Sequence, residues 1–158
     1  MKNLLLLPLI LLPLVANAAE PANHAELLKK IPDEFITRVG GALPDKNGFV
    51  GHNHSGFKGS AFQRGATLTL AIAAARGDQK RAEDCWRAVE ATFAQQKEAG
   101  HFGDPPTSVA FWLCELCRSL LVVQQSPLAK DYQDRIANLL PKLRKSADWL
   151  ATQQATLI

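Results

Sequence analysis

The chain has 158 residues, of which 47% are hydrophobic and 21% charged, and its formal net charge at pH 7 is +3. Removing an N-terminal leader that contains Lys2 leaves 17 of the 18 basic residues against 15 acidic ones. A charge this mild gives no argument for a nucleic-acid partner, although it would tolerate an acidic ligand. About 140 residues then remain, enough for one domain with a hydrophobic core.

The N-terminus has the pattern of a secretory signal peptide. Lys2 precedes an apolar run over residues 4–15, and a small-x-small cleavage pattern ends at Ala18. We therefore expect residues 1–19 to be a signal peptide, removed after Ala18 or Ala19. The run is short for a bilayer span, and no transmembrane segment is expected after it. The mature protein is expected to be periplasmic or secreted, with a retained N-terminal anchor as the alternative.

The next part of the chain predicts two helices separated by a long loop. Residues 20–41 carry apolar side chains at steps of three and four, and Pro32 marks a helix start or kink within them. Residues 42–60 contain four glycines and predict a loop of a length that is often functional. Residues 61–76 predict a helix that is apolar almost all round and therefore buried, ended by Gly77.

The remaining chain predicts three more helices and no strand. Residues 79–98 are amphipathic, residues 108–125 are nearly all apolar, and residues 126–152 are amphipathic again, with Pro141 expected to kink or divide them. Buried and amphipathic helices thus alternate, which predicts an all-α fold of antiparallel helical hairpins in two layers. The Trp86…Gln95-Gln96 pattern returns one hairpin later as Trp149…Gln153-Gln154, as in stacked αα units.

The last four residues, 155–158, lack the polar face that caps a repeat array. We therefore expect residues 20–158 to be one helical domain that continues beyond this sequence. A complete protein of five helices is the alternative.

Three cysteines are present, so an odd one is left unpaired within the chain. Cys114-x-x-Cys117 has the spacing of a redox motif, but it lies inside an apolar helix rather than after a strand. Both cysteines are therefore predicted to be small buried core residues. A bridge from Cys85 to either of them stays open, because only geometry decides it.

The polar groups best suited to a functional site gather in residues 51–64, at the entry to an apolar helix. This stretch contains His52, Asn53, His54 and Arg64. Side chains that transfer protons or bind anions, carried by a loop on a rigid helix, are what an active site needs. Surface polar residues and helix caps are the alternative reading for each of them.

The order of motifs resembles the alginate lyase family over roughly residues 50–125. Asn53-His54-Ser55 enters an Ala-rich helix, an amphipathic helix follows, and the turn Gly100-His101-Phe102 precedes the next apolar helix. The resemblance implies an (α/α) toroid, of which this chain would be an incomplete copy or the N-terminal part. It also implies β-elimination of an acidic polysaccharide, with Asn53 neutralising the uronate carboxylate and His54 helping to remove the C5 proton.

Other residues are second-line candidates for substrate binding. They are His52, Arg64, His101 and Asp104, with Arg64 or Arg118 able to supply the family's arginine if either faces the same cavity. The two loop histidines have no third ligand at metal-binding spacing, so neither a metal nor another cofactor is predicted. Glu115, on a helix predicted to be buried, is expected to pair with Arg118 three residues on.

The sequence therefore predicts an exported carbohydrate-active protein, a polysaccharide lyase if it is an enzyme. The alternatives are a noncatalytic periplasmic helical-repeat module that binds a glycan or peptide, and an inactive truncated relative. An acidic polysaccharide is the expected partner.

Overall fold

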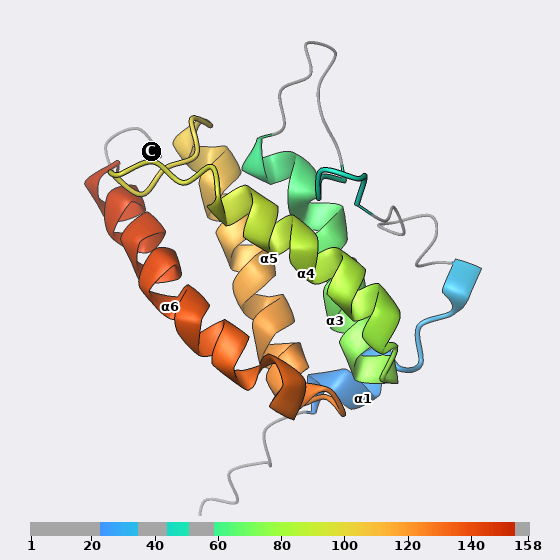
Figure 1. The fold of residues 1–158 in the computed structure, drawn as a ribbon. Helices are drawn as coiled ribbons and strands as arrows, with labels where there is room; N and C mark the ends of the chain where they lie inside the picture. The colour runs from blue at the N-terminus through green and yellow to red at the C-terminus, as the bar shows by residue number, and fades with distance from the viewer. Residues whose placement is uncertain (1–22, 35–43, 51–58, 154–158) are drawn as a thin grey trace, which may run out of the picture.

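The structure is a computed structural model that describes residues 23–34, 44–50 and 59–153 (Figure 1). Every regular element in these ranges is helical, which confirms the all-α prediction. The elements are α1 (His24–Leu28), the 3-10 helix η1 (Ser60–Gln63), α3 (Arg64–Arg76), α4 (Gln79–Phe93), α5 (Pro106–Gln124) and α6 (Ala129–Thr152). The predicted signal peptide lies outside the described residues.

The four long helices form two layers. In Figure 1, α4 and α6 lie toward the viewer and α3 and α5 lie behind them. α3 packs against both α4 and α5, and α5 packs against α6. The short α1 covers part of the opposite side of α3 and α5. The two layers enclose one large apolar core.

Aromatic rings fill the middle of this core. Trp112 packs against Phe93 at 5.1 Å and against Phe102 at 5.2 Å between ring centroids, and Phe93 and Phe102 meet edge to face. These rings come from α4, α5 and the turn between them, so they tie the two layers together. The apolar stripe expected on the third helix is buried throughout: Ala82, Cys85, Trp86, Val89 and Phe93.

Charged groups join the two outer helices. Arg135 on α6 donates to both carboxylate oxygens of Glu83 on α4, at 2.5 and 3.1 Å, and to Glu90 at 3.0 Å. Its guanidinium also stacks over the rings of Trp86 and Tyr132, at 5.0 and 5.3 Å from the centroids. The hydrogen bond from Arg135 lowers the pKa of Glu83, which keeps that carboxylate charged. A bidentate ion pair therefore joins the two outer helices, α4 and α6.

Several predicted helix ends are confirmed and others are wrong. Gly77 ends α3 with a left-handed φ of 72°, and Asp78 caps α4 through the Arg81 amide at 3.0 Å. The first predicted helix instead stops at Leu28, and the chain turns before Pro32. Only residues 33 and 34 are then seen to be helical, because 35–43 lie outside the described residues.

Two later helix predictions also need correction. The third helix ends at Phe93, five residues earlier than expected, because the chain turns there toward Gly100. α6 runs through Pro141 as one continuous helix, so of the two expected effects, a kink or a division, the division is wrong. Proline is tolerated there on a helix face that is exposed to solvent.

The prediction that the fourth helix is buried all round is wrong for one of its faces. Phe111 and Leu121 are 62% and 56% exposed, although eight other residues of α5 are buried. With a mean hydropathy of 1.4, α5 is also long and apolar enough to cross a membrane by length and composition alone. A core helix meets the same criterion, and α5 packs against α3 and α6, so the predicted lack of a membrane span stays a prediction.

The predicted burial of Cys114 and Cys117 is wrong for the same reason. Both lie on the exposed part of α5, whereas Cys85 is fully buried, and all three are free thiols. Burial raises the pKa of the Cys85 thiol to about 12 and also raises that of Cys117. Among the three cysteines, the structure contains no bridge from Cys85.

We expect two of the three thiols to react rapidly with a disulfide reagent in the native, reduced protein. Cys114 and Cys117 are accessible, and Cys85 becomes reactive only on unfolding. Counting released chromophore before and after adding denaturant measures this. Rapid modification of all three thiols in the folded chain would contradict the packing of α4.

The two buried tryptophans should respond differently to replacement by phenylalanine. The indole nitrogen of Trp86 donates to Glu90 at 2.7 Å, whereas that of Trp112 is buried without a hydrogen-bond partner. Trp86→Phe loses a hydrogen bond, and Trp112→Phe removes an unsatisfied donor. We expect Trp86→Phe to lower the free energy of unfolding by about 1 kcal/mol more than Trp112→Phe. Urea unfolding measures the difference, and equal losses would contradict it.

Candidate functional site

The predicted catalytic residues Asn53 and His54, together with His52, lie outside the described residues. The structure does describe the chain on both sides, which ends at Val50 and resumes at Gly59. The structure therefore shows how the chain on either side of this eight-residue segment, numbered 51–58, is held. We call the contacts that Gln63 and Asp104 make with these flanks the frame.

One buried side chain holds both ends of the segment. Gln63, in the last position of η1, is 1% exposed. Its Oε1 accepts from the Val50 amide at 2.8 Å, and its Nε2 donates to the Gly59 carbonyl at 3.5 Å. A buried amide that bonds both flanks fixes where the segment leaves and rejoins the fold.

Asp104 fastens the same place to the neighbouring turn. It is 7% exposed, and its Oδ2 accepts from the Ser60 amide and from the Ser60 hydroxyl, each at 2.5 Å. The carboxylate thus caps the start of η1 from 44 residues away in the sequence. It also places the beginnings of α3 and α5 at one end of the molecule, so these two helices run parallel. Asp104, predicted to bind substrate, is engaged in the frame.

His101 lies in the same turn as Asp104 but packs on the side of α6. Its Nδ1 accepts from the Gly103 amide at 3.1 Å, so the neutral ring carries its proton on Nε2. The ring packs against Trp149 of α6, with centroids 5.3 Å apart. One imidazole nitrogen is therefore used by the turn, and the other is left for solvent or a ligand.

Arg64 lies on the far face of the α3–α5 layer. Its guanidinium is 4.0 Å from the Glu115 carboxylate and 5.7 Å from the ring centroid of Phe111. The expected pairing of Glu115 with Arg118 is thus replaced by a contact between helices. Arg118 lies one turn further along the same face of α5, so both arginines are on one side of the molecule.

The three candidates that the structure describes do not gather into one constellation. Asp104 is in the frame of residues 51–58, His101 contacts α6, and Arg64 contacts α5. The sequence analysis did not identify the roles of Ser60 and Gln63 in this frame. The available signal was a polar residue at the start of an otherwise apolar helix.

The sole tyrosine of the chain lies away from the residues described above. Tyr132, the sole tyrosine of the chain, is buried between α4 and α6 and donates to Glu83 at 3.4 Å. Burial, followed by the charge of Glu83, raises its pKa to about 12. A phenol in that position cannot reach a substrate beside α3 and α5.

Comparison of the chain with protein-family models, with curated proteins and with solved structures finds no match. The resemblance to the alginate lyases therefore stays a prediction, based on Asn53-His54-Ser55 and Gly100-His101-Phe102. Within the described residues, no three His, Cys, Asp or Glu side chains gather as a metal site would require.

Two glycines of the turn that carries His101 and Asp104 provide a matched test of this end of the molecule. Both have a left-handed φ, 102° at Gly100 and 92° at Gly103. A Cβ at Gly100 would overlap the Lys145 carbonyl oxygen, whereas one at Gly103 would meet nothing within 4 Å. We expect Gly103→Ala to cost about 1–2 kcal/mol from backbone strain alone and Gly100→Ala clearly more. Thermal unfolding measures both, and equal losses would contradict the close approach of this turn to α6.

Proposed function

We propose that the chain is an exported carbohydrate-active protein that binds an acidic polysaccharide through residues 51–58 and the start of α3. In its active form it would be a polysaccharide lyase that works by β-elimination. The signal-peptide pattern of residues 1–19 supports export, and the alternation of helices supports an (α/α) toroid built from hairpins. The observation that carries the proposal is the frame of Gln63 and Asp104 around the segment.

The frame is suited to the chemistry because it limits where the polar side chains can be. A uronate C5 proton is only weakly acidic, so its removal needs a neutralised carboxylate and a base close to it. Asn53 would donate to the carboxylate, and His54 would take the proton. A segment of eight residues with both ends fixed loses less freedom on binding than a free loop, which favours such a preorganised site.

Charge on the neighbouring helices also favours an acidic ligand. Arg64 and Arg118 lie on one face of the α3–α5 layer, and Glu115 is the carboxylate between them. This leaves an excess of one positive charge beside the start of α3. Arg64, which is half exposed, is the residue best placed to meet a substrate carboxylate.

A noncatalytic glycan-binding module is the second candidate. The observation that favours it is the position of Tyr132, whose phenol is locked between α4 and α6 with a pKa of about 12. Without that acid, His54 would have to serve both the C5 proton and the leaving oxygen. A protein that only holds the polysaccharide needs neither transfer.

The test follows the ultraviolet absorbance of unsaturated uronate product with alginate and other polyuronates. A lyase should lose about 10²–10⁴-fold in turnover as His54→Ala, because a general base is removed. Asn53→Ala should lose turnover as well, whereas Asn138→Ala, at an exposed position of α6, serves as the matched control. Absence of product from folded wild type on every uronate would remove the lyase proposal.

Binding separates the second candidate from an inactive relative. Calorimetry with the same polysaccharides should detect saturable binding that Arg64→Gln weakens if the protein is a binding module. Absence of both product and binding would leave an inactive relative and contradict both proposals.

A further inference from the structure

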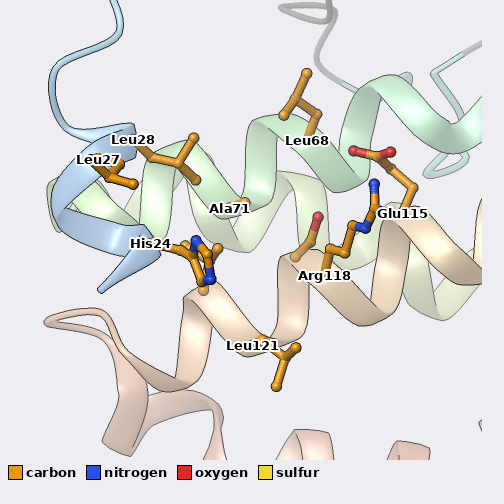
Figure 2. A pocket seen from close by; sticks show the side chains of 10 residues that line it. His24, Leu27, Leu28, Leu68, Ala71, Glu115, Arg118 and Leu121 are labelled. Carbon is orange, nitrogen blue, oxygen red and sulfur yellow. The ribbon is translucent and has the colours of Figure 1, made fainter. Parts of the chain in front are cut away.

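A groove of about 410 Å³ lies on the face of α3 and α5 that the outer helices do not cover (Figure 2). α1 closes one end of it. The apolar lining residues are Leu27, Leu28, Leu68, Ala71, Leu121 and Val122. This volume is in the range of pockets that hold one small ligand, and apolar walls with few polar groups are typical of them.

The two charged residues of the groove lie at one end of it, while the polar residues His24 and Ser119 also line it, His24 at the α1 end. Figure 2 shows Leu27 and Leu28 at the end formed by α1, and Glu115 and Arg118 together at the other end. Leu121 lies at the edge of the groove and is 56% exposed to solvent. A ligand that filled this groove would need a long apolar part and a polar group at one end.

The polar end carries an unbalanced positive charge. Glu115 is paired with Arg64 at 4.0 Å. In the part of the chain that the structure describes, Arg118 makes no hydrogen bond and no ion pair. Its guanidinium therefore remains available, with five N–H donors in a geometry that matches a carboxylate.

The walls of the groove are held firmly enough to keep its shape. Ala25 of α1 is buried against Ala71, Ala75 and Val122. The His24 amide donates to Gln125 Oε1 at 3.1 Å, which ties the start of α1 to the end of α5. Arg76, at the end of α3, pairs with Asp33 and donates to the Ile31 carbonyl, which fixes the chain that leaves α1.

We propose that this groove is a binding site for a single-chain fatty acid, whose carboxylate pairs with Arg118 and whose alkyl chain lies along the leucines toward α1. The separation of apolar walls from one unpaired cation matches an amphiphile with an acidic head. A sugar chain would leave its hydroxyl groups unsatisfied against Leu27, Leu28 and Val122. The proposal rests on the residues that line this groove and does not depend on the proposed function.

The test measures binding of octanoate, decanoate and dodecanoate to the purified chain by calorimetry, below their micelle concentrations. Affinity should rise about fourfold for each added methylene until the groove is full. The alcohol and the amine of the same chain length should bind about tenfold more weakly than the acid, because neither can form the ion pair with Arg118.

Two pairs of matched variants locate the site. Arg118→Gln should abolish the preference for acid over alcohol, while Arg144→Gln, on the exposed side of α6, should leave it unchanged. Leu121→Ser should weaken the chain-length dependence, while Leu140→Ser, a leucine of α6 with the same 56% exposure, should not. All four positions are exposed, so folding is expected to survive, and thermal unfolding checks this.

No saturable binding by wild type would overturn the proposal. So would an acid preference that survives in Arg118→Gln, or an effect of Leu140→Ser as large as that of Leu121→Ser. Uronate binding is read separately, from the variants of Asn53, His54 and Arg64, so failure of the fatty-acid proposal can be told apart from failure of the proposed function.

Discussion

The guanidinium of Arg135 is the interaction that holds α4 and α6, the two helices of the outer layer, side by side. It lies over the rings of Trp86 and Tyr132 and forms ion pairs with Glu83 and Glu90 of the neighbouring helix. A partly buried charge is stable only when its hydrogen bonds are satisfied, so this pairing allows essentially one position of α6 against α4. The turn between α4 and α5, which carries His101 and Asp104, is positioned as a result.

A second set of polar contacts holds the turn next to the proposed site. At the same end of the molecule, Ser146 of α6 donates to the Gly100 carbonyl at 2.6 Å, and Gln96 donates to Ser146 and to the Lys142 carbonyl. The turn is thereby held against α6, and Asp104 can reach across to Ser60. The frame around residues 51–58 therefore rests on contacts made by α6, which lies in the other layer.

The free face of the α3–α5 layer explains two features that otherwise conflict. α5 is apolar enough to resemble a membrane span, yet Phe111, Cys114 and Leu121 on it are exposed. One side of the helix packs into the core, and among the described elements α1 lies over part of the other side. Apolar residues on that second side line the groove beside Arg118. The high hydropathy of α5 therefore reflects two apolar surfaces, the core and the groove.

Local physics made most of the helices predictable from sequence. The amphipathic patterns of α4 and α6 and the almost continuous apolar character of α3 and α5 identified these four helices. Gly77 ended α3 where expected because a left-handed residue closes that turn. The single helix predicted over residues 20–41 is interrupted: α1 ends at Leu28, and the chain is helical again at residues 33 and 34, after the start or kink predicted at Pro32. The break was visible only as Pro32, which restricts the residue before it.

The sequence by itself determined that this protein is all-α, because the pattern of apolar and polar residues that predicts a helix involves only residues close together in the chain. It also singled out the polar stretch before α3. Only the tertiary structure decided that Glu115 pairs with Arg64 rather than Arg118, that Asp104 caps Ser60, and that Cys114 faces solvent. These outcomes depend on partners tens of residues away, and no local rule for spacing on one helix specifies which neighbouring helix will lie beside it.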